Sequence, residues 1–171
     1  MSQLAVPAAT NSAVREVLGH FASGVLVVTA DGPTGPIGLT CQSFVSLSLD
    51  PLLIAFAPAR TSRTWPLVRE AGAFGVNVLS AGQAATSAAF ARSGADKFHG
   101  VPWSPGAGGA PLLQDVCAWL TCELWNEYDG GDHTLAVGRV LTVGADPGRE
   151  PLIFHRSRYR ELAPAVPECS L

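Results

Sequence analysis

Several patterns that would point to a metal, a membrane or a nucleic acid are missing from this chain of 171 residues. Its four cysteines form no C-x-x-C pair and have no histidine repeat at zinc spacing, so we expect reduced thiols and no metal site. No apolar run reaches the roughly 18 residues of a spanning helix, and the N-terminus lacks a basic segment before an apolar core. The net charge of -3 and the lack of basic runs argue against a nucleic-acid partner. We therefore expect a soluble, cytoplasmic protein.

The common phosphate-binding and hydrolase motifs are also missing: no G-x-G-x-x-G opens a helix, and there is no P-loop, H-E-x-x-H or G-x-S-x-G. Only 15% of the residues are charged whereas 47% are apolar, a balance that favours extensive burial and an oligomer. The length suits one domain over residues 1–171, with a loose N-terminal arm at 1–10 and a C-terminal tail at 163–171.

Alternating or β-branched segments predict six or seven strands, at residues 25–30, 38–49, 52–57, 74–79, 118–125, 134–141 and 151–154. Three short helices are predicted: one begins at Asn11 or Ser12 and ends at Gly24, one spans 65–71, and one follows the capping-box pair Ser80 and Gln83. We expect 52–57 to be buried on both sides, 102–111 to be irregular and 155–160 to be a polar tail segment. Closely spaced strands without repeats indicate a mainly β protein, an antiparallel barrel with a few short helices.

One predicted strand is polar where a buried strand should be apolar. Thr40, Gln42 and Ser43 carry hydroxyl and amide groups, which need hydrogen-bond partners when they are buried. Either the neighbouring backbone satisfies them, or a polar, planar ligand lies along the strand; an ordinary strand with an exposed polar face is the third interpretation. We interpret Cys41, in the same segment, as a small buried hydrophobe.

A second polar cluster precedes the helix predicted at 65–71. Arg60 and Arg63 alternate there with the hydroxyls of Thr61, Ser62 and Thr64. The free N–H groups and the dipole of a helix N-terminus favour an anion, so the cluster is a candidate phosphate site. A capped loop with two solvated arginines is the alternative.

Seven motifs, in this order and with 38–40 and 43–44 counted as one, resemble the short-chain flavin reductase family, the NAD(P)H:flavin oxidoreductase components of two-component flavin-dependent monooxygenases. The segments are 21–25, 38–40, 43–44, 46–51, Ser62-Arg63-Thr64, 74–79, Asp96-Lys97-Phe98 and Gly131-Asp132-His133. They extend from about Phe21 to Leu162. The chain departs from the family at Leu52, where a second proline is common, and in a Gly/Pro-rich insertion at 104–109.

The resemblance implies a split β-barrel, a homodimer with flavin near the subunit interface, and the use of NADH or NADPH. By the same resemblance Thr40, Cys41, Gln42 and Ser43 would line the isoalloxazine, Asp50 and Pro51 would shape a nearby loop, and Arg60, Ser62, Arg63 and Thr64 would hold the flavin phosphate. Asn77 and Val78 would reach the same pocket through their backbone, and His133 would border the nicotinamide with Lys97, Phe98 and Tyr159.

The implied activity is hydride transfer from NADH to FAD or FMN and release of the reduced flavin to a partner monooxygenase. A lone histidine after a Gly-Gly-Asp turn is usually solvated, but the resemblance makes His133 a candidate to position nicotinamide. Asp132 either holds its imidazole or caps the turn. Two alternatives stay open: a flavoprotein that retains its flavin and acts on a small organic substrate, and a non-catalytic flavin- or haem-binding protein. FAD versus FMN, and NADH versus NADPH, are not distinguished.

Overall fold

The computed structural model of the protein describes residues 9–94 and 96–163. Residues 1–8 of the predicted arm (1–10), residues 164–171 of the predicted tail (163–171) and Cys169 lie outside the described residues. Within the described ranges, no helix is long and apolar enough to cross a bilayer. Cys41, Cys117 and Cys122 are free thiols, as predicted for these three.

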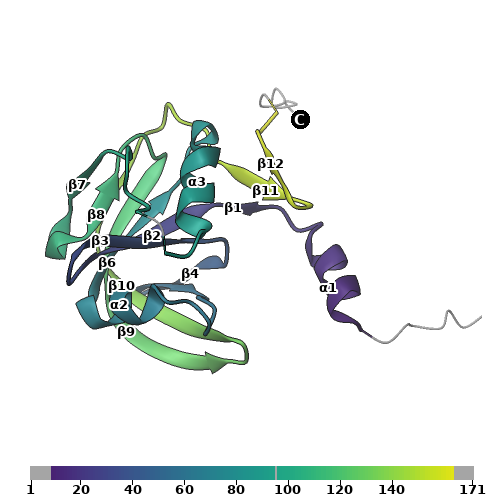
Figure 1. Ribbon diagram of the computed structural model, residues 1–171, viewed down its shortest axis with the longest axis horizontal. Coiled ribbons are helices and arrows are strands. Elements are labelled where there is room, and N and C mark those ends of the chain that lie inside the picture. Colours follow the sequence, from purple (N-terminus) through teal and green to yellow (C-terminus); the bar gives the residue numbers. More distant parts are fainter. Residues whose placement is uncertain (1–8, 95, 164–171) are drawn as a thin grey trace, which may run out of the picture.

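A seven-stranded antiparallel sheet forms the body of the molecule (Figure 1). Its strand order is β3-β2-β6-β9-β10-β5-β4. The strands are β2 (Leu26–Gly32), β3 (Gly35–Cys41), β4 (Phe44–Leu49), β5 (Leu52–Phe56), β6 (Ala73–Val78), β9 (Ala118–Gly130) and β10 (His133–Ala145). The edge strands β3 and β4 are linked by only Gln42 and Ser43, so the sheet curls until one end of each edge meets the other.

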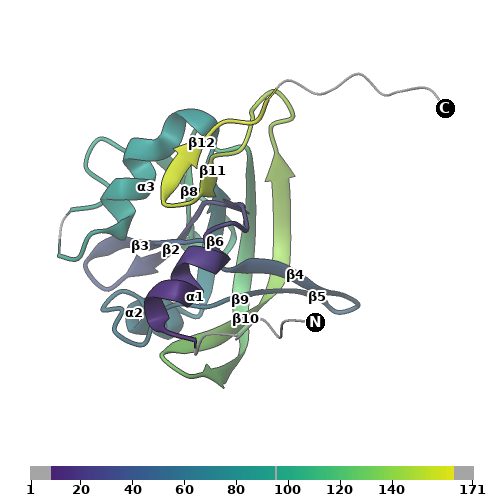
Figure 2. The ribbon, with the colours of Figure 1, turned by 90° about the vertical axis from the view of Figure 1, so that its right-hand side faces the viewer.

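Two smaller sheets complete the strands. A three-stranded sheet joins β1 (Ser23–Gly24), β11 (Ile153–His155) and β12 (Arg158–Arg160), and β7 (Trp103–Pro105) pairs with β8 (Pro111–Leu113). The mainly β, antiparallel character predicted from the sequence is therefore confirmed. The long β9–β10 hairpin runs the height of the molecule (Figure 2).

Three α-helices flank the strands: α1 (Asn11–Leu18), α2 (Trp65–Ala71) and α3 (Ala84–Ala91). Short 3-10 turns lie at Ala81–Gln83, before α3, and at Ala107–Gly109. In Figure 1, α3 lies above β2 and β3 and α2 lies below them, whereas α1 stands apart from the body. No residue of α1 is buried, and its apolar Val17 and Leu18 are exposed.

Strand β2 is buried on both faces and separates two hydrophobic clusters. Val28 faces the larger one, where the ring of Phe56 meets Trp65 edge-on at 5.3 Å and Phe74 at 5.6 Å between centroids. Val27 faces the smaller one, which lies under α3 and includes Phe90. Successive strand residues point to opposite faces, so one strand serves both clusters.

The prediction was wrong at several segments. The irregular stretch expected at 102–111 contains the β7–β8 hairpin, and the polar tail expected at 155–160 contains β12, which pairs with β11. Such strands of three residues are too short to show a period in sequence. Helix α1 ends at Leu18, before the Gly24 we expected, and the 52–57 strand is buried only in its second half.

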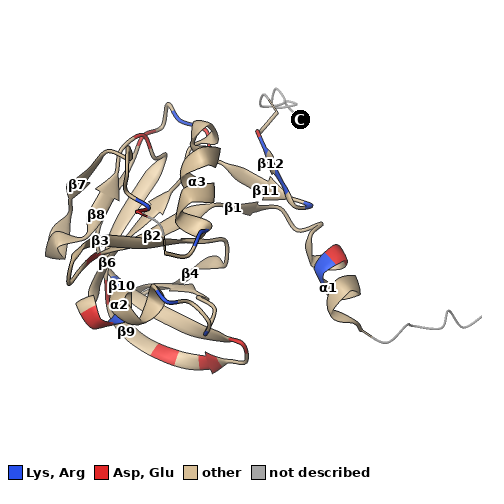
Figure 3. Cartoon of the chain, viewed as in Figure 1, with Lys and Arg blue, Asp and Glu red and all other residues tan. Residues whose placement is uncertain are grey.

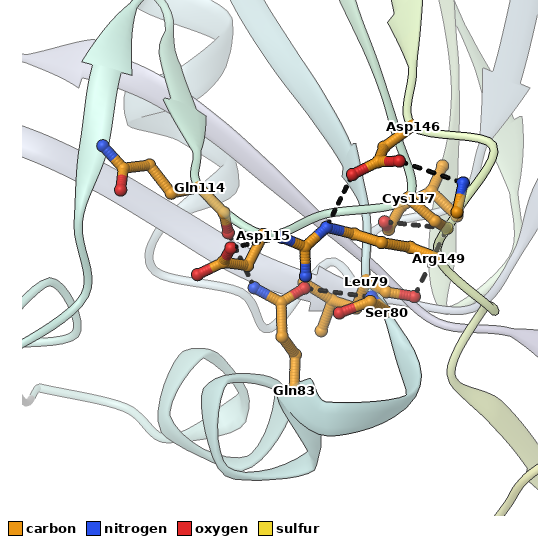
Figure 4. Close-up of polar contacts among 10 residues, drawn as sticks. Leu79, Ser80, Gln83, Gln114, Asp115, Cys117, Asp146 and Arg149 are labelled. Atoms are coloured by element: carbon orange, nitrogen blue, oxygen red, sulfur yellow. Dashed lines mark hydrogen bonds and ion pairs between the residues drawn. The ribbon is translucent and has the colours of Figure 1, made fainter.

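A polar network away from the main sheet edges fixes the chain between β10 and β11 (Figure 4). Arg149 donates from Nε to Asp146 at 2.9 Å and from Nη2 to Asp115 at 2.6 Å. Beside it, Gln83 accepts from the Ser80 backbone at 3.0 Å in the predicted capping box, which is confirmed. Every charge in the network has a partner, so we assign it a structural role.

Candidate functional site

A cleft of about 610 Å³ opens where the two edges of the main sheet meet. Its walls come from the end of β3 and the link to β4, the loop between β5 and α2, the end of α3 with the segment after it, and the start of β10. The residues predicted from the sequence that line it are Thr40, Cys41, Gln42, Ser43, Ser62, Arg63, Thr64, Lys97 and His133.

The polar strand forms one wall of this cleft, and protein groups satisfy most of its side chains. Thr40 donates from Oγ1 to the carbonyl of Ser87 on α3 at 2.7 Å. Ser43 Oγ accepts from the backbone N–H of Ala57 at 2.9 Å and lies 3.1 Å from Cys41 Sγ. The backbone interpretation therefore holds for Thr40 and Ser43, whereas Gln42 is exposed in the cleft.

The structure divides the predicted phosphate cluster. Arg60 does not line the cleft; its guanidinium donates to Asp129 at 2.8 Å, on the β9–β10 hairpin. Ser62 Oγ accepts from the backbone N–H of Trp65 at 3.1 Å, which caps the first turn of α2. Arg63 is therefore the cation that this loop presents to the cleft.

Lys97 connects three walls of the cleft through its ammonium group. Nζ donates to the carbonyl of Gly38 on β3 at 2.8 Å, to that of Phe90 on α3 at 3.1 Å and to Thr64 Oγ1 at 3.4 Å. An ammonium has three N–H donors, and all three are engaged. Burial lowers the pKa of Lys97, because desolvation disfavours its charge.

His133 reaches the cleft because the tip of the β9–β10 hairpin is bound to the β5–α2 loop. The backbone N–H of Arg60 donates to the carbonyl of Asp132 at 2.9 Å, and that of Thr134 to the carbonyl of Pro58 at 3.0 Å. His133 Nδ1 lies 2.7 Å from the carboxylate of Asp132. This hydrogen bond and the imidazole charge hold the pKa of Asp132 below its ordinary value. The ionised carboxylate accepts, so Nδ1 carries the proton and Nε2 is left for a ligand.

Asn77 and Val78 do not line the cleft, because both belong to the interior of the main sheet. Asn77 is fully buried; its amide nitrogen donates to the Val27 carbonyl and to Thr29 Oγ1, both at 3.1 Å. Its amide oxygen accepts from the backbone N–H of Leu113 at 2.8 Å. These bonds occupy the side chain in joining β6, β2 and β8.

The remaining predicted residues also lie outside the lining. Phe98 packs edge-on against Phe90 at 4.9 Å between ring centroids, and Asp50 and Pro51 form the exposed turn between β4 and β5. Tyr159, on β12, donates to Ser87 Oγ at 2.9 Å. Since Ser87 also accepts from Thr40, Tyr159 lies one residue behind the cleft wall.

Sequence reasoning missed the wall formed by the end of α3. Phe90, Arg92, Ser93 and Gly94 line the cleft there. No local motif marks these residues, because their place depends on how α3 packs over β3. Charged residues are sparse over the whole chain (Figure 3), yet the described residues of this lining include Arg63, Arg92 and Lys97 and no carboxylate.

This composition suits a ligand with an anionic, phosphate-bearing end and a planar polar ring. Two arginines with open positions offer charge-assisted hydrogen bonds, while the edge of β3 offers backbone and amide groups. Among the described residues, no group of histidines, cysteines and carboxylates could hold a metal ion. The donors fit a flavin phosphate without a Rossmann motif.

Comparisons with known proteins agree with this geometry. Residues 18–163 match the family model described as flavin reductase like domain. The chain is 41% identical over 150 residues to the flavin-dependent monooxygenase reductase subunit HsaB of Rhodococcus jostii, covering 88% of this chain and 77% of that protein. It is 43% identical over 150 residues to the FMN reductase (NADH) SmoA of Agrobacterium fabrum, covering 87% and 85%.

A solved structure extends the likeness to three dimensions. The NADH:FAD oxidoreductase SgcE6 of Streptomyces globisporus, in complex with NAD and FAD fragments, superposes with a TM-score of 0.85 at 36% identity, covering 93% of this chain and 94% of that one. The match thus spans nearly all of both chains, and the residues matched by the family model, 18–163, include every wall of the cleft. The chain belongs to the flavin reductase like domain family.

Proposed function

We propose that this protein is an NAD(P)H-dependent flavin reductase that reduces FAD or FMN and releases the reduced flavin to a partner monooxygenase. The observation that carries the proposal is the cleft itself, which has cations and no carboxylate in its described lining and the polar strand as one wall. The activities named for SmoA, an FMN reductase (NADH), and SgcE6, an NADH:FAD oxidoreductase, support NADH and flavin as the reactants. The name of HsaB supports a monooxygenase as the recipient.

In this proposal the wall from Thr40 to Ser43 lies along the flavin ring, and Gln42 supplies its exposed amide to the polar edge. Arg63 binds the flavin phosphate, with the Ser62 and Thr64 hydroxyls near it. Arg60 acts from outside the cleft by holding the hairpin that carries His133.

Hydride passes from nicotinamide to flavin, a transfer between two rings that requires no protein acid or base. The contribution of the chain is to orient the rings and exclude water. His133 performs the first task through Nε2, because Asp132 fixes Nδ1 and thus the plane of the imidazole.

The proposal includes a homodimer. Helix α1 and the β4–β5 hairpin expose Val17, Leu18, Leu49 and Leu52, and we infer that a second copy covers them and completes a split barrel. A Leu49→Asp, Leu52→Asp double variant should shift the mass measured by light scattering from dimer to monomer, whereas a wild-type monomer would contradict this part. We further propose one domain, located in the cytoplasm.

Steady-state NADH oxidation with FAD, FMN, riboflavin or no added flavin tests the function. Oxidation that requires free flavin and saturates with its concentration is expected. If added flavin has no effect and the purified protein keeps a coloured cofactor, the flavin is a resident group and the reductase assignment fails. Colour without any NADH oxidation would favour the flavin- or haem-binding alternative.

A further inference from the structure

Arg92 is a cation of the cleft that forms no ion pair with any other described residue. It follows the last turn of α3, lines the cleft and is exposed. Among the described residues, the carboxylates that form ion pairs are all taken by other side chains, and none pairs with Arg92. An arginine without a protein partner keeps its planar set of donors available for an anion.

Among the described residues, the other two Lys or Arg side chains of the cleft have different roles: Lys97 binds protein groups, whereas Arg63, which forms no ion pair there either, is assigned to the first phosphate by the proposed function. Lys97 donates its three N–H groups to Gly38, Phe90 and Thr64. Arg63 comes from the β5–α2 loop, next to Ser62 and Thr64, and one phosphate group is enough to engage it. Arg92 comes from a different wall, built by α3.

Two arginines on separate walls match a ligand that carries two phosphate groups. FMN has one phosphate, riboflavin has none, and FAD has a diphosphate. We propose that Arg92 binds the second phosphate of FAD and makes the cleft selective for FAD over FMN. This inference rests on the proposed function, because it names which flavin the same site takes.

The chemistry of the cleft favours this arrangement. A second phosphate adds negative charge, and the described lining has no carboxylate to repel it. Arginine can bind a phosphate through two parallel N–H donors, which gives both strength and orientation. The side chain is long and exposed, so it can follow a diphosphate that extends out of the cleft without moving the ring.

Binding of FAD, FMN and riboflavin to wild type and to Arg92→Ala, followed by flavin fluorescence, tests the proposal. Losing one charge-assisted hydrogen bond should raise the Kd for FAD about tenfold. The Kd values for FMN and riboflavin should change less than about twofold, because neither reaches Arg92. Arg92→Lys should retain part of the preference for FAD, and Arg158→Ala, an exposed arginine on β12 outside the cleft, should retain all of it.

Riboflavin binding also reports whether the Arg92→Ala cleft is intact, because that ligand has no phosphate. An equal loss for FAD and FMN would overturn the proposal and place Arg92 at the first phosphate. Unchanged binding of FAD would overturn it as well. If wild type bound none of the three flavins, the proposed function itself would fail. That result differs from the two outcomes above, which overturn only the role of Arg92.

Discussion

Lys97 Nζ lies 2.8 Å from the carbonyl oxygen of Gly38 and binds the segment after α3 to the edge strand β3. The resemblance had placed Lys97 beside nicotinamide, but its donors are directed at protein carbonyls and a hydroxyl. It therefore acts as a positioning residue that keeps three walls of the cleft at fixed distances.

Lys97→Met should loosen these walls while keeping the apolar part of the side chain. We expect a loss of about 1–3 kcal/mol in the free energy of unfolding, since bonds from a charged group are removed. The Kd for FMN should rise, because Thr64 loses its link to Lys97. Urea unfolding and flavin titration measure the two effects, and unchanged values for both would contradict the positioning role.

The same variant should change how stability depends on pH. Burial lowers the folded-state pKa of Lys97 below 10.5, so between those two values the unfolded chain binds more protons. The Lys97 contribution to stability should therefore rise as the pH rises through the folded pKa, and level off above the unfolded one. Unfolding free energies of wild type minus Lys97→Met should increase in alkaline buffer; a decrease would show that the pKa is raised.

His133→Ala should affect nicotinamide binding more than the chemical step. Loss of the oriented imidazole should raise the KM for NADH about tenfold, because one hydrogen bond contributes about 1.4 kcal/mol to binding. The kcat at saturating NADH should fall much less, because no proton transfer depends on the residue. Asp132→Asn, which weakens the hold on Nδ1, should give a smaller change in the same direction. Abolished flavin reduction at saturating NADH would disprove the positioning role.

Asn77→Ala should cost stability and leave flavin affinity unchanged. The substitution leaves the buried N–H of Leu113 without its acceptor, which costs about 1–3 kcal/mol. Denaturant unfolding measures the cost, and flavin titration in native buffer measures affinity. If folded Asn77→Ala protein also bound flavin more weakly, Asn77 would belong to the cofactor site after all.

Gly38→Ala should disturb the contact between β3 and α3. An added Cβ would lie 2.6 Å from the ring of Phe90 and 3.0 Å from the Val28 carbonyl, so buried groups must move. Overpacking of this kind costs about 1–3 kcal/mol. Gly24→Ala is the matched control, because nothing lies within 4 Å of its added Cβ. Equal melting temperatures for the two variants would show that Phe90 adjusts freely.

The sequence predicted the elements whose signal is local. The alternation at 74–79 and the Ser80–Gln83 capping box both appear as expected, because period and capping depend only on near neighbours. The strands of three residues could not be predicted, since pairing with β11 or β8 is what makes β12 and β7 extended.

The site followed the same rule. The polar strand and the Ser62-Arg63-Thr64 segment were visible because each forms one continuous stretch. The different roles of Arg60 and Arg63 could not be predicted from the sequence, because Arg60 is held outside the cleft by Asp129, which lies far along the chain. No sequence pattern marks Arg92 as a site residue, since only the packing of α3 places this lone arginine in the cleft wall.

The two backbone hydrogen bonds between the hairpin tip and the β5–α2 loop have a dynamic consequence. The amides of Arg60 and Thr134 can exchange with deuterated solvent only when tip and loop separate. Their protection factors should thus be similar and should rise together when flavin occupies the cleft. Under conditions where exchange is faster than reclosing, these two amides measure how often the entrance opens, and that opening rate can be compared with kcat.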